Sequence, residues 1–292
     1  MKASKAHARS VAIVIGADHV GSAAAVALHR AGIDAVICDD IDPPWARRGM
    51  SFTNAWYFGN AELDGETAVC CASAKSIPSL LRREGVIAAT PWSWRGIAFA
   101  LNPIAIVQSR PTTRHEAGTF RARAPEAAIT VGIGDGYTAG VDVDIAIASS
   151  PDDVDGTIVA DQTTGFDART GRLGVTAEGS WFLRAPVAGR FATNRRIGEP
   201  VRHGHVIGAI GSMEVVAPID GVLRGLSARG AAVFEGVVVA EVDPRGDPAL
   251  CFGIDEHAWG LAQRVVAALA RRLQGTTAAP ELGIVPAGAH AE

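Results

Sequence analysis

The chain has 292 residues, of which 48% are hydrophobic, and its 27 basic and 31 acidic residues give a formal net charge of −4. This length predicts about two domains of ordinary size, and the slightly acidic balance gives no electrostatic case for a nucleic-acid partner. No apolar stretch approaches the roughly 20 residues that cross a bilayer, so we expect no membrane partner.

The first ten residues are basic and polar, and we expect a flexible arm over 1–10. The arm contains no apolar segment of its own, which argues against a secretory signal. The four cysteines show neither CxxC nor zinc-site spacing. Together these features predict a protein of the reducing cytoplasm.

A strand, a glycine-containing turn, a helix, a second strand and an acidic pair open the chain, in that order: Val11–Ile15, Gly16–Gly21, Ser22–Ala31, Ala35–Cys38, and Asp39 with Asp40. This order is typical of the beginning of a dinucleotide-binding βαβ unit. We therefore predict an α/β Rossmann-like domain over 11–175. In such a domain, Asp39 or Asp40 either meets a ribose hydroxyl or ends the strand in solvent.

The phosphate-binding fingerprint in this turn is altered. Gly16 and Gly21 match its glycines, but Asp18 stands where a middle glycine lets the backbone approach a pyrophosphate. A carboxylate there repels phosphate, and Asp18 is more simply interpreted as the N-cap of the following helix. The sequence thus favours Rossmann-like topology more strongly than binding of NAD.

Two further groups of candidate ligand residues follow predicted strands. Arg47 and Arg48 come after the second strand, where their guanidinium groups would suit a phosphate, carboxylate or molybdate. Solvated surface arginines are the alternative. Ser51 adds a hydroxyl but has no identifiable histidine partner, so the catalytic residues stay unknown and the sequence leaves open whether the protein is an enzyme.

Later in the domain we expect apolar strands at Val86–Ala89, Ile104–Val107 and Ala127–Ile133. The last of these opens into a glycine cluster whose N–H groups are able to converge on an anion. A flexible loop between strands is the alternative. The candidate ligand residues of this cluster are Gly134, Gly136, Tyr137 and Thr138.

The second half contains an internal repeat with a period of 32 residues. The segment 185–189 recurs as 217–221, and Gly198, Val201 and Gly204 recur as Gly230, Val233 and Gly236. Two such units bury their apolar faces against each other around a pseudo-two-fold axis. This pattern resembles the all-β barrel-sandwich hybrid of biotinyl and lipoyl carriers, which we predict for 176–250.

Those carriers attach their cofactor to a lysine between the two halves. The only lysines of this chain are Lys2, Lys5 and Lys75. The hybrid domain therefore has no acceptor lysine and carries neither biotin nor lipoate. We interpret it as a docking or structural element.

The carboxyl-terminal region is expected to form a helix within 251–275, followed by a disordered tail over 276–292. Leu261, Val265, Leu269 and Leu273 recur at steps of four and form a packing stripe. The histidines at 203 and 205 are interpreted as a surface corner, and we expect no metal site.

Several short segments, in the same order, resemble accessory proteins of the selenium-dependent molybdenum hydroxylase system, the YqeB-like proteins. The matching pieces are Leu28–Gly32, Arg47-Arg48-x-x-Ser51-Phe52, Gly134-x-Gly136-Tyr137-Thr138, Arg184-Ala-Pro186-x-x-Gly189, Ala217–Gly225 and Asp243-Pro244-Arg245-Gly246. This chain departs from the family in two turns, because it has Asp18 where the family has glycine and Asp135 where the family has proline.

The resemblance implies an accessory or maturation protein that handles the molybdenum cofactor or a nucleotide-like ligand and docks on a molybdenum hydroxylase client. The alternatives are an NAD(P)-dependent oxidoreductase and a non-catalytic interaction scaffold in a molybdenum or C1 enzyme system. The sequence identifies neither the client nor the bound ligand, and it leaves open a homo-oligomer and the involvement of selenium.

Overall fold

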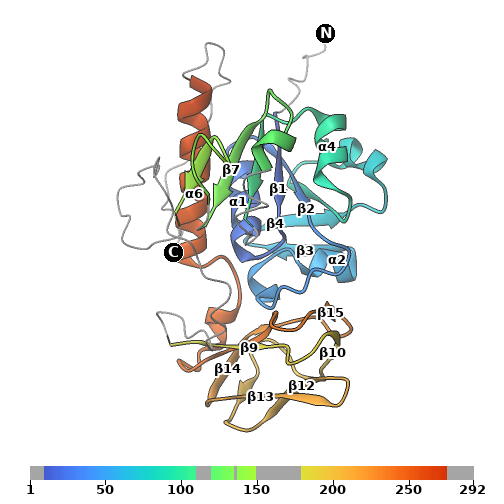
Figure 1. Ribbon diagram of the computed structural model, residues 1–292, viewed down its shortest axis with the longest axis vertical. Coiled ribbons are helices and arrows are strands. Elements are labelled where there is room, and N and C mark those ends of the chain that lie inside the picture. Colours follow the sequence, from blue (N-terminus) through green and yellow to red (C-terminus); the bar gives the residue numbers. More distant parts are fainter. Residues whose placement is uncertain (1–9, 110–119, 135–136, 149–178, 275–292) are drawn as a thin grey trace.

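A computed structural model describes residues 10–109, 120–134, 137–148 and 179–274 of the chain. Figure 1 shows two units, one above the other. The upper unit is an eight-stranded sheet with helices on both faces, and the lower unit consists of two four-stranded sheets. The predicted arm and tail lie outside the described residues, apart from Ser10.

Six parallel strands form the main part of the large sheet, in the spatial order β5-β2-β1-β6-β7-β8. Their bounds are β1 Val11–Ile15, β2 Asp34–Cys38, β5 Val86–Thr90, β6 Ala105–Gln108, β7 Ile129–Ile133 and β8 Ile145–Ile147. Counted along these six strands, the order is 3-2-1-4-5-6, which is the order of the doubly wound sheet. The Rossmann-like assignment stays a prediction, and this order supports it.

A hairpin widens the sheet beside β5. It consists of β3 (Asn60–Leu63) and the antiparallel β4 (Glu66–Cys70), and β4 runs parallel to β5. Asp64 and Gly65 both have positive φ, 48° and 84°. An Asp-Gly pair tolerates these angles and is favoured in two-residue hairpin turns.

Helices cover both faces of this sheet. Apolar residues of α1 (His19–Arg30) and α6 (Glu256–Gln274) pack with those of β1 and β2 on one face, together with α2 (Asn54–Phe58). The other face is covered by α3 (Ile77–Leu80) and α4 (Trp94–Leu101). The described residues also contain three short 3-10 turns, η1 Arg48–Met50, η2 Ala74–Ser76 and η3 Pro248–Cys251, and residues 120–123 are helical.

The first helix begins three residues before the predicted Ser22. Asp18 caps it, since its carboxylate accepts hydrogen bonds from the backbone N–H groups of Val20 and Gly21. The predicted capping role of Asp18 is confirmed. The prediction of the helix start was wrong because the turn glycines were counted as loop, whereas Gly21 lies within the first turn of α1.

The last helix, α6, belongs structurally to the first unit. Leu261, Val265 and Leu269 of the predicted stripe are buried in the core that α1 and the large sheet share. Ala258 and Ala262 pack against small residues of α1. The chain therefore leaves the first unit, forms the second, and returns to complete the first.

The second unit shows the 32-residue repeat as two sets of four strands. The first set is β9 Trp181–Arg184, β10 Gly189–Ala192, β11 Pro200–Val201 and β12 Val206–Ile210. The second set is β13 Met213–Val216, β14 Gly221–Leu226, β15 Ala232–Val233 and β16 Val238–Asp243. Each strand of the second set begins 32 residues after its counterpart in the first.

The two repeats are interleaved. One sheet has the order β13-β12-β10-β15 and the other has the order β9-β16-β14-β11, so exchanging the two repeats converts each sheet into the other. Phe191, Ile207, Leu223 and Val239 fill the space between the sheets. This arrangement supports the barrel-sandwich hybrid assignment, which stays a prediction.

Candidate functional site

Polar side chains gather at the carboxyl edge of the parallel sheet, where open α/β folds bind ligands. Asp18 follows β1, Asp39 follows β2 and Ser109 follows β6, and all three are buried. The Ser109 hydroxyl donates to Asp18 Oδ2 at 2.8 Å. The strand order reverses between β1 and β6. This bond therefore joins the two loops that follow these strands, at the topological switch point of the sheet.

Asp18 has an unusual protonation equilibrium. Burial raises its pKa to about 6, and the charge of Asp39 adds to this effect. Hydrogen bonds from Gly21, Ser109 and Val20 act in the opposite direction but do not cancel it. The carboxyl group is therefore held in an environment that penalises its charge.

The predicted glycines serve close packing of the turn against the helix. Gly16 has a φ of 115°, which favours glycine. A Cβ atom on Gly21 would lie 2.1 Å from the Gly16 carbonyl oxygen and 2.5 Å from Ser109 Oγ. Both glycines are thus required by the geometry of the turn itself.

Asp39 is bonded within the protein at the position predicted to meet a ribose. Its Oδ2 accepts from the Ala17 N–H at 2.6 Å and from the Trp45 indole N–H at 2.7 Å. Its Oδ1 accepts from the Asp40 N–H at 2.7 Å. A ribose hydroxyl would have to compete with the Trp45 indole, whereas Asp40 lies exposed to solvent.

Ser51 lies behind the turn in a buried cluster of hydroxyl groups. Its Oγ is 2.8 Å from Thr53 Oγ1, and the Thr53 hydroxyl donates to the Ala17 carbonyl at 2.7 Å. Ser22 supports the same turn, since its Oγ accepts from the Phe52 N–H at 2.9 Å. This cluster fixes the β1–α1 turn from the inside.

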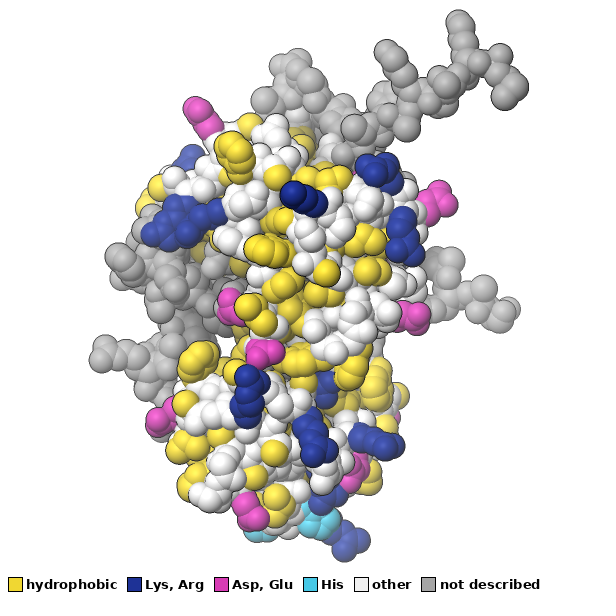
Figure 2. All heavy atoms as spheres, turned by 90° about the vertical axis from the view of Figure 1, so that its right-hand side faces the viewer, with side chains coloured by type: hydrophobic (Ala, Val, Ile, Leu, Met, Phe, Trp, Pro, Cys, Tyr) yellow, Lys and Arg dark blue, Asp and Glu magenta, His cyan; other side chains and the backbone are white. Residues whose placement is uncertain are grey.

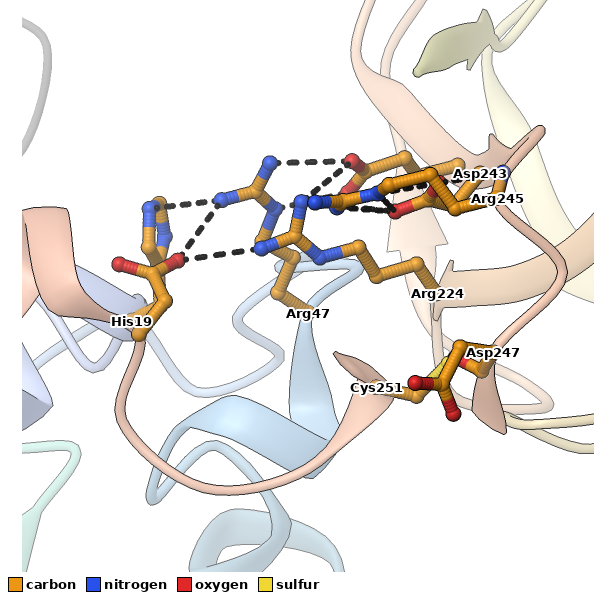
Figure 3. A network of polar contacts seen from close by, with 9 residues as sticks. His19, Arg47, Arg224, Asp243, Arg245, Asp247 and Cys251 are labelled. Atoms are coloured by element: carbon orange, nitrogen blue, oxygen red, sulfur yellow. Dashed lines mark hydrogen bonds and ion pairs between the residues drawn. The ribbon is translucent and has the colours of Figure 1, made fainter. Parts of the chain in front are cut away.

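Arg47 joins the two units (Figure 3). Its Nε and Nη2 donate to the two carboxylate oxygens of Glu241 on β16, at 2.7 and 3.0 Å. Its Nη1 lies 3.2 Å from His19 Nε2 and 3.5 Å from Asp255 Oδ2. Since arginine has no acceptor, His19 Nε2 accepts this bond, which assigns the neutral tautomer with the proton on Nδ1.

His19 is a much weaker base than an exposed histidine. Burial and the neighbouring Arg47 guanidinium lower its pKa to about 3. The imidazole is therefore neutral at physiological pH and acts as an acceptor.

Further ion pairs extend this network into the second unit. Arg224 Nη2 lies 3.3 Å from Asp255, and its Nη1 lies 3.8 Å from both Glu241 and Asp243. Although burial acts to raise the pKa of Asp243, hydrogen bonds from Arg245 hold it below its usual value. Figure 3 shows these side chains, together with His19 and Arg47, in a chain of contacts between the units.

Arg48 also lies in the joint. Its Nε donates to the Leu226 carbonyl of β14 at 2.7 Å, and its Nη1 donates to Asn54 at 2.7 Å. The Leu226 N–H in turn donates to the Ala46 carbonyl at 2.7 Å. Arg47 and Arg48 are both half-buried and donate to groups of the protein, so the alternative of solvated surface arginines was wrong.

The glycine cluster after β7 uses its backbone groups within the fold. The Gly134 N–H donates to the Ile147 carbonyl at 2.9 Å, and the Thr138 N–H donates to Asp142 at 2.8 Å. The Tyr137 ring is buried against Gly132. Gly136 lies outside the described residues, so the predicted anion cradle stays a prediction.

Sequence reasoning missed several residues that build the edge and the joint: His19, Trp45, Ser109, Arg224, Glu241 and Asp255. Glu241 carried a recognisable signal, because it interrupts an otherwise apolar strand, Val238–Val242, and its side chain is fully buried. The other five carried none: the partners of His19, Ser109, Arg224 and Asp255 lie far away in the chain, and nothing in the sequence marks the Trp45 indole as a partner of Asp39.

Other candidate features are absent from the described ranges. Within residues 10–109, 120–134, 137–148 and 179–274, no group of three His, Cys, Asp or Glu side chains is placed to hold a metal ion. His203 and His205 are exposed at a turn, as expected for a surface corner. No helix in the part that the structure describes is both long and apolar enough to cross a membrane.

No known family model matches the chain. It is 29% identical, over 287 residues and 97% of its length, to the uncharacterized protein YqeB of Escherichia coli strain K12. The chain covers 51% of that relative and so spans about half its length. This similarity supports the predicted YqeB-like resemblance, while the molybdenum role and the cytoplasmic location stay predictions.

Among solved structures, the chain shows a local similarity to a succinylglutamatedesuccinylase/aspartoacylase from Rhodobacter sphaeroides. The match is 29% identical and covers 21% of each chain, with a TM-score of 0.20. A score this low carries no argument about fold or function.

Proposed function

We propose that this chain is an accessory protein in the maturation of a molybdenum-dependent hydroxylase. In this proposal, the first unit handles the molybdenum cofactor or a nucleotide-like ligand at the carboxyl edge of its sheet. The second unit, which lacks an acceptor lysine, docks on the client enzyme. The observation that carries the proposal is the Asp18–Ser109 pair at the switch point.

The chemistry of that edge favours a ligand rich in N–H donors. A dinucleotide needs bare backbone N–H groups for its pyrophosphate, whereas here a carboxylate already accepts the first N–H groups of α1. A carboxylate repels phosphate but accepts hydrogen bonds from an amino group and a ring N–H. The pterin ring of a molybdenum cofactor offers both of these donors.

An NAD(P)-dependent oxidoreductase is the second candidate, and the strand order of the large sheet favours it. The Ala17 N–H and the Trp45 indole argue against it, because both already donate to Oδ2 of the carboxylate that a ribose would use. If this candidate were correct, a reduced nicotinamide would bind saturably and Gly16→Trp would weaken the binding. No binding at millimolar ligand would dispose of it.

The proposal is tested by deleting the gene in the host. We expect the molybdenum hydroxylase client to accumulate as protein but to lack activity, and the wild-type gene to restore that activity. Glu84→Gln, which changes an exposed carboxylate of the first unit just before the amino end of β5, serves as a control and should restore activity equally. Full client activity in the deletion strain would contradict the proposal.

A second measurement addresses the ligand directly. The protein purified from its host is denatured, and the released fraction is assayed for molybdenum and for oxidised pterin fluorescence. We expect a stoichiometric pterin. A third class of function, a pure interaction scaffold, predicts no released small molecule, and variants of Arg47 do not test it because that residue holds the units together.

A further inference from the structure

Two large apolar side chains are exposed at the carboxyl edge beside Asp39 and Asp40. Ile41 is 77% exposed and Trp92 is 51% exposed. Other hydrophobic side chains lie on the side of the upper unit that carries α4, with Lys and Arg side chains among them (Figure 2). Because open α/β folds bind ligands at this edge, exposed apolar side chains here are candidates for ligand contact.

The sheet register places these two residues at neighbouring strand ends. β2 and β5 are adjacent and parallel, with Cys38 opposite Thr90. The Asp39 N–H donates to the Thr90 carbonyl at 3.2 Å. Ile41 lies two residues after Asp39, and Trp92 lies two residues after Thr90. The two segments therefore leave the sheet side by side at its carboxyl edge.

The backbone beneath Trp92 is fixed. Its N–H donates to Thr90 Oγ1 at 3.2 Å, and Thr90 itself is buried. A half-exposed indole on an anchored backbone offers a flat face to a ligand at little entropic cost. Bases stack on such aromatic faces regardless of their identity.

We infer that Ile41 and Trp92 bind the flat face of a two-ring heterocycle, a pterin or a purine. The neighbouring exposed carboxylate, Asp40, is an acceptor, so the site favours a ring edge with an amino group and a ring N–H, as in pterin or guanine, over adenine. This inference rests on the proposed function and names the part of the ligand that the edge recognises.

The test is calorimetric titration of the purified full chain with neopterin, GMP and AMP. We expect neopterin and GMP to bind more tightly than AMP. Trp92→Ala should weaken binding by roughly 10-fold or more, the scale of losing one base–aromatic stack, whereas Trp92→Phe should retain most of it. Phe99→Ala removes an aromatic side chain that is 92% exposed on α4 and should bind like the wild type.

A urea unfolding curve for each variant separates a loss of binding from a loss of folding, since Trp92 is only half-buried. Equal binding by Trp92→Ala and the wild type, or no binding of any of the three compounds at millimolar concentration, would overturn the inference. If neopterin bound equally well to the wild type and to Trp92→Ala, the inferred site at Ile41 and Trp92 would be wrong, but the proposed handling of a cofactor would not be contradicted. If GMP bound in a way that depended on Trp92 and neopterin did not bind, the inferred site at Ile41 and Trp92 would be supported and the proposed handling of a pterin cofactor would be contradicted.

Discussion

At the scale of single residues, Asp18 makes stability depend on pH in a direction opposite to that of most carboxylates. Its pKa is raised from 3.8 to about 6 in the folded protein, so the folded state binds the proton more tightly than the unfolded chain does. The stability that Asp18 contributes is therefore complete below about pH 4 and is lost as the pH rises through 6.

Replacing Asp18 by asparagine keeps an oxygen for the helix cap but removes the charge. We expect Asp18→Asn to gain stability relative to the wild type between pH 4 and pH 7, by up to about 3 kcal/mol. Urea unfolding of both proteins at several pH values measures the difference in their free energies of unfolding. Groups that titrate alike in both proteins do not contribute to this difference. A difference that stays the same across these pH values would contradict the raised pKa of Asp18.

At the scale of elements, the packing of α1 against its own turn depends on Gly21. A methyl group there would meet the Gly16 carbonyl oxygen, which is backbone and unable to move aside. Gly21→Ala should therefore destabilise the fold by about 1–3 kcal/mol or more, the usual range for overpacking. The measurement is the midpoint of urea unfolding.

A matched variant exists in α6. Gly260 is also a helical glycine, but a Cβ atom there meets nothing within 4 Å. Gly260→Ala should be stabilising by up to about 1 kcal/mol, because alanine favours the helix. If Gly21→Ala were tolerated as well as Gly260→Ala, the close approach at the β1–α1 turn would be refuted.

At the scale of the whole molecule, the Arg47–Glu241 pair is central to how the two units are held together. The Glu241 side chain is fully buried, so removing its partner leaves a buried charge with weaker compensation. We expect Arg47→Met to lower the free energy of unfolding by about 3–5 kcal/mol. The double variant with Glu241→Leu should lose less than the single variant, which a double-mutant cycle measures.

Arg190 and Asp42 form the comparison pair, since they also connect the units, at 3.5 Å, but with exposed side chains. Arg190→Met should change stability by less than about 1 kcal/mol. Equal losses for Arg47→Met and Arg190→Met would show that burial of the Glu241 carboxylate does not matter to the joint.

The elements of the fold could largely be predicted from the sequence, whereas the contacts between the units could not. The apolar run Val11–Ile15 and the 32-residue repeat specify strands locally, and the structure has them at those positions. Arg47 and Arg48 were recognised as special residues, but their partners on β14 and β16 lie almost two hundred residues away. A guanidinium suits a bound oxyanion and a buried glutamate equally well, and only the folded chain decides between them.

The packing of α6 on α1 has a consequence for how the protein is made. Domains usually fold as they emerge from the ribosome, amino-terminal parts first. Here the part of α1 that packs on α6, which includes Ala23 and Ala27, is covered only after residues 256–274 have been synthesised. The first unit is therefore completed after the second, and until then this part of α1 stays open to chaperones and to other nascent chains.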